Sequence, residues 1–343
     1  MKGNLLIGFV NQFYTEKLNL GIYELSSNKF YWIYNNEITR SLGHVIGVNG
    51  IIRFKDKFIV GYQSKPTKIG IYDSELKLLK VLLLDNVIDL HSFAIMNDKL
   101  YCVSTGTNQV IEITLTDDFD ISDTKPFYSY GNNIKKDIYH LNSISAYNDC
   151  LYITMFGGGN NNSWKNSKNG QLLRISDKKV IKKSLQQPHT VYSIDTSLSY
   201  CESKTGKFYW GETEYNLLNY TRGICFSNDF IFVGSSGKRI KSRSEGTINT
   251  NEASNVEETK SYISIINRSS KKSETKIFLN DFGTEIYELL YLDKDFKIPE
   301  WIKVNSWKDF NIEHLREKIM SQQEFIVNYS IKKRIYNLFK LNL

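Results

Sequence analysis

Three histidines, an arginine and a glutamate are the residues of this chain best suited to chemistry on a small ligand. His91, His140 and His189 follow one another at intervals of 49 residues, and Arg222 and Glu285 come later in the chain. Imidazole transfers protons near neutral pH, and guanidinium binds a carboxylate or phosphate through paired hydrogen bonds. The set therefore favours acid–base chemistry on an anionic or polyhydroxylated molecule.

These residues stand at or near the starts of short apolar segments that read as buried strands. In a ring of radially arranged sheets, the innermost strands all start near the central axis at one face, so distant residues meet there. We expect a central funnel at that face. Its predicted catalytic residues are His189, His140 and Arg222. Its predicted ligand-binding residues are His91, Asn142, Asn49, Glu285, Glu288 and Trp164.

Two sharper hypotheses and one structural alternative follow from this set. In the first, His189 is the general acid or base and Arg222 holds the substrate anion. In the second, two or three histidines together with Glu285 bind one divalent metal ion, although the chain has no HxH or HExxH spacing. In the structural alternative, the same polar groups only bridge neighbouring sheets, for example through an Arg222–Glu285 pair. His44 and His314 fall outside the pattern and receive no predicted role.

The elements that must position these residues repeat along the chain. Units of about four short strands recur every 40–50 residues, separated by turns such as those at 97–98, 148–149 and 228–229. That period is typical of a β-propeller, in which each four-stranded sheet buries its faces against its neighbours. Inner strands are predicted near Asn49, His91, Asn142, Thr190, Arg222 and Ile286. Six blades result, with seven as the alternative because 119–130 could hide further strands.

The two ends of the repeat region predict how the ring closes. Three N-terminal strands, at 5–10, 21–26 and 29–34, lack an inner strand, whereas the last inner strand, at 286–292, lacks outer ones. Their pairing in one sheet would leave no unpaired edge. The predicted domains are therefore a propeller over 1–298 and an amphipathic helical extension over 299–343. The extension is expected to pack on the side or bottom of the propeller, and contact of its basic end with a membrane surface or a partner protein is the alternative. A polar loop over 237–260 and a glycine-rich insertion that carries Trp164 are the predicted long insertions.

Composition limits the class of protein. The 343 residues are 41% hydrophobic and 13% aromatic, and the net charge of +7 is modest for this length, so no nucleic-acid partner is expected. The four cysteines show no CxxC spacing and predict buried free thiols in a reducing compartment. With neither an export signal nor a membrane-spanning segment in view, a cytoplasmic location is expected.

Several short motifs give the chain a family resemblance. In order, they are His140-Leu141-Asn142-Ser143-Ile144, Gln187-Pro188-His189-Thr190, Tyr220-Thr221-Arg222-Gly223-Ile224 and Glu285-Ile286-Tyr287-Glu288. Together they resemble a family of bacterial conserved hypothetical proteins, a domain of unknown function with a propeller-type repeat. The likeness covers about 90–299, and the Asn49 unit fits it poorly. The resemblance implies a six-bladed architecture, shared positions at the residues quoted, and an association with surface-glycan metabolism.

Two functions remain open on the sequence alone. The preferred one is that the funnel binds a small anionic or sugar-derived molecule, with lyase, epimerase or hydrolase chemistry by histidine if a reaction takes place. The alternative is a non-catalytic scaffold that docks a partner enzyme through the 237–260 loop and the C-terminal extension. Whether the protein is an enzyme is left undecided at this stage.

Overall fold

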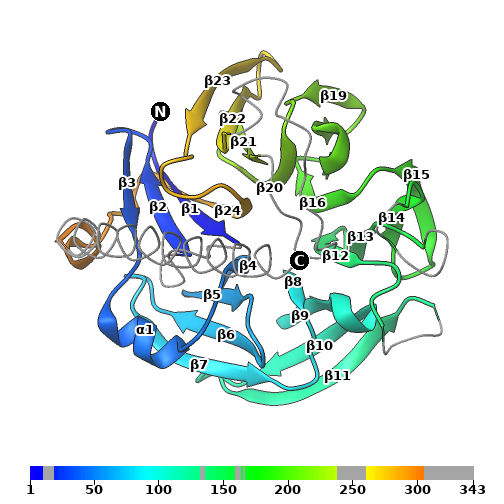
Figure 1. Ribbon diagram of the computed structural model, residues 1–343, viewed down its shortest axis with the longest axis horizontal. Helices are drawn as coiled ribbons and strands as arrows, with labels where there is room; N and C mark the ends of the chain where they lie inside the picture. Colours follow the sequence, from blue (N-terminus) through cyan, green and yellow to red (C-terminus); the bar gives the residue numbers. More distant parts are fainter. Residues whose placement is uncertain (11–18, 132–135, 159–163, 165–166, 238–259, 305–343) are drawn as a thin grey trace, which may run out of the picture.

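Six four-stranded antiparallel sheets form a ring around a central axis in the computed structural model (Figure 1). The structure describes residues 1–10, 19–131, 136–158, 164, 167–237 and 260–304. Five sheets are continuous in sequence: β4–β7, β8–β11, β12–β15, β16–β19 and β20–β23. The sixth has the strand order β24-β1-β2-β3 and so joins the last strand to the first three. The predicted six-bladed propeller and its closure are confirmed, and the seven-bladed alternative is wrong.

The strands of the first three sheets in chain order are these. The closing sheet contributes β1 (Asn4–Phe9), β2 (Leu20–Glu24), β3 (Lys29–Trp32) and the late strand β24 (Ile286–Leu292). Next come β4 (Val48–Phe54), β5 (Lys57–Tyr62), β6 (Thr67–Tyr72) and β7 (Leu78–Leu84). The following sheet has β8 (Leu90–Met96), β9 (Lys99–Ser104), β10 (Gln109–Leu115) and β11 (Ile121–Ser129).

The remaining three sheets follow the same plan. They consist of β12 (Leu141–Tyr147), β13 (Cys150–Met155), β14 (Gly170–Arg174) and β15 (Lys179–Leu185), then β16 (Pro188–Ile194), β17 (Ser197–Glu202), β18 (Lys207–Trp210) and β19 (Thr213–Asn216), then β20 (Tyr220–Phe226), β21 (Phe230–Ser236), β22 (Tyr262–Asn267) and β23 (Ser273–Phe278). Helix α1 (Asn36–Leu42) and the short helices η1 (Thr105–Thr107) and η3 (Ser203–Thr205) lie in connections.

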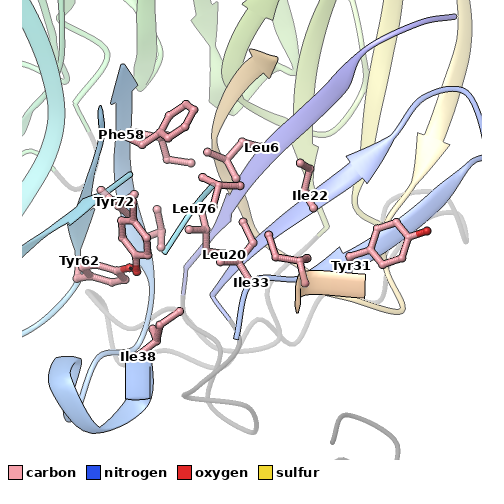
Figure 2. Packing of buried hydrophobic residues seen from close by; sticks show 14 of the residues in the cluster. Leu6, Leu20, Ile22, Tyr31, Ile33, Ile38, Phe58, Tyr62, Tyr72 and Leu76 are labelled. Carbon is pink, nitrogen blue, oxygen red and sulfur yellow. Dashed lines mark hydrogen bonds between the residues drawn. The ribbon is translucent and has the colours of Figure 1, made fainter. Parts of the chain in front are cut away.

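The core lies between the sheets. Inner and middle strands carry apolar, often β-branched residues that are buried on both faces, because each sheet is covered by a neighbour on either side. Figure 2 shows one such cluster, in which Leu6, Ile22 and Phe58 pack between the closing sheet and the β4–β7 sheet. Ile298 and Ile302, after the last strand, are buried in the same cluster. The chain beyond residue 304, where most of the predicted helical extension falls, is outside the described residues.

Every inner strand contains one irregularity near its start. The registers of β4, β8, β12, β16 and β20 with their neighbours each shift there, as does the register of β24 with β1. A bulge of this kind leaves one extra residue without a ladder partner and re-aims the side chains around it. Six repeats of the same device turn polar side chains toward the central axis at one end of the ring.

The bulges leave backbone N–H and C=O groups without a partner in their own sheet, and side chains of the preceding blade hydrogen-bond to these groups. Asn49, Thr105, Ser203 and Ser236 each donate to the carbonyl of a residue in the inner strand of the following blade, at 2.5–3.0 Å. Hydroxyls of Ser92, Ser143 and Thr190 accept from N–H groups of the following inner strand, at 3.0–3.4 Å. The hydrogen bonds of the bulges therefore also join the blades to one another.

Candidate functional site

The carbonyls that accept these inter-blade hydrogen bonds define equivalent positions in different blades. They belong to Leu90, Leu141, Thr221 and Ile286. We call the residues directly after these carbonyl residues the lower tier, and we add the residues at the matching bulge positions of β4 and β16. The lower tier comprises Asn49, His91, Asn142, His189, Arg222 and Tyr287. We call the residues directly before the same carbonyl residues the upper tier. It comprises Asp89, His140, Gln187, Tyr220 and Glu285, with Gly47 at the matching position before β4.

The two tiers form part of the wall of a cavity of about 1550 Å³ at this end of the axis. All upper-tier residues other than Gly47 line it, together with Asn49, His91, Arg222 and Tyr287 of the lower tier. Loops from around the ring complete the wall with Trp164, Phe156, Lys204 and Asn219, among others. The predicted funnel is therefore present in the structure as a large lined cavity.

His91 and His189 are held by the same local geometry. The residues two positions before them, Asp89 and Gln187, adopt left-handed backbone conformations with φ of 57° and 51°. Their carbonyl oxygens thereby lie 3.0 and 3.1 Å from the Nδ1 atoms of His91 and His189. Because a carbonyl only accepts, each Nδ1 carries the proton, and each Nε2 keeps its lone pair.

His189 lies behind the cavity wall. It is 2% exposed, and its ring packs against Phe156, Tyr220 and Tyr287, with ring centroids 5.0–6.5 Å apart. Its Nδ1 also lies 2.8 Å from the hydroxyl of Ser203, which itself donates to the next blade. Burial, and then the charge of Arg222, hold the pKa of His189 well below its usual value. His189 is therefore neutral at physiological pH.

His140 lines the cavity and is hydrogen-bonded to a carboxylate, whereas Nδ1 of His91, which also lines the cavity, bonds the Asp89 carbonyl and lies 3.6 Å from the Asp89 carboxylate. Its Nδ1 lies 2.7 Å from Oδ2 of Asp137, and its backbone N–H donates to Oδ1 of the same side chain at 2.9 Å. The carboxylate accepts the Nδ1 proton, which leaves Nε2 as the basic atom of the ring. The ring itself stacks on Trp164 at 4.1 Å and touches Phe156 and His91. Asp137 thus fixes the orientation of the His140 ring.

Arg222 is a nearly buried cation at the cavity wall. Its guanidinium lies over the rings of Tyr220 and Tyr287, 4.7 and 4.9 Å from their centroids, and the residue is 8% exposed. Burial alone would lower the pKa of Arg222, but its interactions with Tyr220, Tyr287 and Glu285 outweigh that effect and raise it. Its Nε is buried without a hydrogen-bond partner. The charge is thus compensated in part by aromatic faces, which also fix the plane of the guanidinium.

A comparison with protein families places the chain. The model of a family described as a domain of unknown function (DUF4915) matches residues 36–302. The chain belongs to this family. The match spans the Asn49 unit, which was expected to fit the family poorly.

Solved structures resemble this DUF4915 chain in fold. A protein of unknown function from Bacteroides caccae is 7% identical with a TM-score of 0.57, covering 85% of this chain and 99% of that one. A chain of a nidogen/laminin complex is 10% identical with a TM-score of 0.55, covering 85% and 98%. A putative 6-phosphogluconolactonase from Bacteroides fragilis is 9% identical with a TM-score of 0.51, covering 85% and 98%. No curated protein matches the sequence.

The structure brings together most, not all, of the residues proposed for the site from the sequence of this DUF4915 chain. His91, His140, Arg222, Asn49, Glu285 and Trp164 line one cavity. Asn142 is buried, with its Oδ1 accepting from Thr154 at 2.8 Å, and is not part of the wall. Glu288 also lies outside the wall, and burial raises its pKa to about 8. His44, which received no role, lines the outer part of the cavity.

Sequence reasoning missed four residues that shape the site. Asp137 orients His140, Ser203 contacts His189, and Tyr220 and Tyr287 enclose Arg222. Tyr220 and Tyr287 stood in the motifs that carry the family resemblance, two residues before Arg222 and two after Glu285. The only sequence signal of Asp137 is its position three residues before His140. This spacing indicates a contact only when the turn between the two residues is known.

The remaining expectations can be compared only with the residues that the structure describes. Within the described residues, no group of three His, Cys, Asp or Glu side chains is arranged to hold a metal ion. Cys102, Cys201 and Cys225 are buried free thiols, and Cys150 is half-buried. None of the helices in the described ranges has the length and apolar character needed to cross a bilayer. Nearly all of the predicted 237–260 loop, and the extension beyond residue 304, lie outside those ranges.

Proposed function

We propose that the cavity of this DUF4915 protein binds a small anionic, sugar-derived molecule and that His140 exchanges protons with it. The observation that carries the proposal is Arg222, a nearly buried guanidinium held between two tyrosine rings on the wall that also presents His140. A fixed cation of low exposure in a lined cavity is suited to a carboxylate or phosphate, which it binds more strongly there than in water.

The rest of the wall suits a hydroxylated body behind the anionic group. Asn49 and Gln187 line the cavity with amides that are only partly used: Nδ2 of Asn49 donates to the Leu90 carbonyl and Oε1 of Gln187 accepts from the Tyr220 hydroxyl. Oδ1 of Asn49 can still accept from a sugar hydroxyl, and Nε2 of Gln187 can donate to one. Trp164 and Tyr220 add aromatic surface against which the less polar face of a sugar ring can pack. The fold likeness to a putative 6-phosphogluconolactonase supports the inclusion of phosphorylated sugar acids among the ligands to test.

A proton-transfer role belongs to His140 and not to His189. Nε2 of His140 has the free lone pair on a ring that lines the cavity, whereas His189 is shielded by Phe156 and Tyr220. When Nε2 takes a proton from the carbon next to a bound carboxylate, the electron pair of the C–H bond moves into that carboxylate. Arg222 would stabilise the resulting negative charge, and Asp137 the imidazolium. Lyase and epimerase reactions both begin with this step.

Calorimetric titration with galacturonate, glucuronate and 6-phosphogluconate tests the binding part of the proposal. Arg222→Gln should weaken binding of the preferred acid by at least about tenfold, because it removes a charge-assisted contact worth roughly 1.5–3 kcal/mol. Arg174→Gln is the matched control, since Arg174 pairs with Asp177 on the β14–β15 hairpin and neither residue lines the cavity. Equal affinity of the Arg222 variant and the wild type would refute the anchor.

Proton exchange in heavy water tests the chemical part. With the acid that binds, the wild type should exchange the hydrogen next to the carboxylate for deuterium, as followed by proton NMR. His140→Gln should abolish the exchange while it leaves the dissociation constant within about threefold. Asp137→Asn should slow the exchange and shift its pH profile, because the orienting carboxylate is lost. Undiminished exchange in the His140 variant would remove this residue from the reaction.

A further inference from the structure

The cavity does not end at the two tiers but continues outward over the β4–β7 blade. This extension, here called the side groove, is lined by residues from three connections of that blade: Ile46, Gln63, Ser64, Lys65, Asp85 and Ile88. Arg222 stands in the β20–β23 blade, which the closing sheet separates from the β4–β7 blade (Figure 1). One continuous space therefore runs from the anchoring cation to the rim of the ring.

At this blade the upper tier lacks a side chain, because its residue is Gly47. It occupies the upper-tier position of the β4 blade, where the other five blades place a polar or aromatic side chain in the cavity wall. A Cβ at Gly47 would lie 2.7 Å from Cα of Val10 and 2.9 Å from Oε1 of Gln63, so the backbone there leaves no room for a larger residue. Val10 and Gln63 fill the place of the missing side chain and line the cavity there, and Gln63 belongs to the side groove.

The size and lining of the whole space indicate the shape of its ligand. A volume of about 1550 Å³ exceeds the roughly 300–1,000 Å³ that hold a single drug-sized molecule. The side groove mixes hydroxyl, amide and charged groups of Ser64, Gln63, Lys65 and Asp85 with the aliphatic side chain of Ile88, which is 52% exposed. Such a lining suits a hydroxylated chain with aliphatic C–H faces, and Lys65 can meet a further carboxylate on it.

We infer that the ligand is elongated: an acidic oligosaccharide with its anionic sugar at Arg222 and its further sugar units in the side groove. The inference rests on the proposed function, because it takes Arg222 as the anchor of the acidic group. It deepens that function by naming a chain of two or more sugars, instead of a single sugar acid, as the substrate class.

Titration with galacturonate and its linear dimer and trimer tests this inference. In the wild type, affinity should rise by at least about tenfold from monomer to trimer, since added units gain contacts in the groove. Ser64→Trp, which fills the groove, should bring trimer affinity down to the monomer value while monomer affinity changes by less than about twofold. Ser269→Trp, on an exposed turn of the β22–β23 hairpin, is the matched control. Lys65→Ala provides a second groove variant should the tryptophan disturb folding, with a smaller loss confined to the longer ligands.

The outcomes separate the two proposals. Monomer binding that depends on Arg222 without any gain on lengthening would overturn the elongated ligand and leave the anchor in place. A length-dependent gain that neither groove variant reduces would also overturn it, because the added units would then lie elsewhere. Affinity for every ligand that is indifferent to Arg222→Gln would instead remove the proposed function itself.

Discussion

Replacement of the carboxyl of Glu288, a partly buried residue of β24, by an amide should stabilise the protein in a strongly pH-dependent way. Glu288 follows the lower tier on β24, lies near Cys225 and Tyr192, and accepts a hydrogen bond from the N–H of Leu289 at 3.2 Å. Burial raises its pKa from 4.5 to about 8. Between these two values the folded protein binds a proton that the unfolded chain does not, so stability falls as pH rises through that interval.

The magnitude follows from the difference between the two pKa values. Each unit corresponds to about 1.4 kcal/mol, so the cost of Glu288 is near zero at pH 4, roughly 3 kcal/mol at pH 7 and up to about 5 kcal/mol above pH 8. Glu288→Gln should therefore raise the free energy of unfolding little at pH 4.5 and by a few kcal/mol at pH 8.5.

Urea unfolding of the wild type and Glu288→Gln at four or five pH values measures this difference directly. Glu212→Gln is the control for the change in net charge, because Glu212 is an exposed carboxylate at the turn before β19. Its profile should run parallel to that of the wild type. Parallel profiles for Glu288→Gln as well would refute the reasoning, since they would mean that the carboxyl titrates alike in the folded and unfolded states.

Three further predictions concern the tiers and the joints between blades. The wild type should lose stability below about pH 6.5, because the pKa of buried His189 is lowered and the unfolded chain takes up the proton first. His189→Gln should reduce this loss. Melting temperatures measured from pH 7 to 5 test the prediction, and an equal dependence on pH in wild type and variant would contradict it. Ser203→Ala should lower the free energy of unfolding in urea by about 1–3 kcal/mol, because it leaves the Thr221 carbonyl without this donor. The control Ser122→Ala, on an exposed strand, should lower it by less. Gly223→Ala should lower the free energy of unfolding by roughly 1 kcal/mol or more. The backbone φ of Gly223 is 69°, and an added Cβ would lie 3.2 Å from Leu289 and from the Tyr287 carbonyl. An unchanged free energy of unfolding would show that alanine fits there without strain.

The ring could be predicted from the sequence because its inner strands are buried on both faces and read as short apolar segments. The outer strands β15, β19 and β23 were not predicted, since Lys179–Leu185, Thr213–Asn216 and Ser273–Phe278 are largely exposed and polar. Helix α1 was also missed. Its local signals are Asn35, whose side chain accepts from the N–H of Ile38 at 2.7 Å, Glu37 in the first turn, Arg40 in the last turn and the C-cap Gly43.

The register of the histidines was the weakest part of the prediction for the site. His91, His140 and His189 are equally spaced in sequence, yet His140 belongs to the upper tier and the other two to the lower tier. The connections between blades differ in length, so an equal interval does not guarantee an equal structural position. Only the inter-blade hydrogen bonds reveal that Asn142 is the true counterpart of His91.

The pairing of β24 with β1 ties the completion of the ring to the order of synthesis. On the ribosome, the N-terminal strands emerge first and lack their innermost partner until Ile286–Leu292 has left the exit tunnel. For most of translation, β1 therefore presents an open edge toward the growing set of blades, as edge strands do before they are covered. Premature termination within the last inner strand would leave five complete sheets and one three-stranded remnant, a nascent product with two exposed edges that chaperones and proteases would recognise.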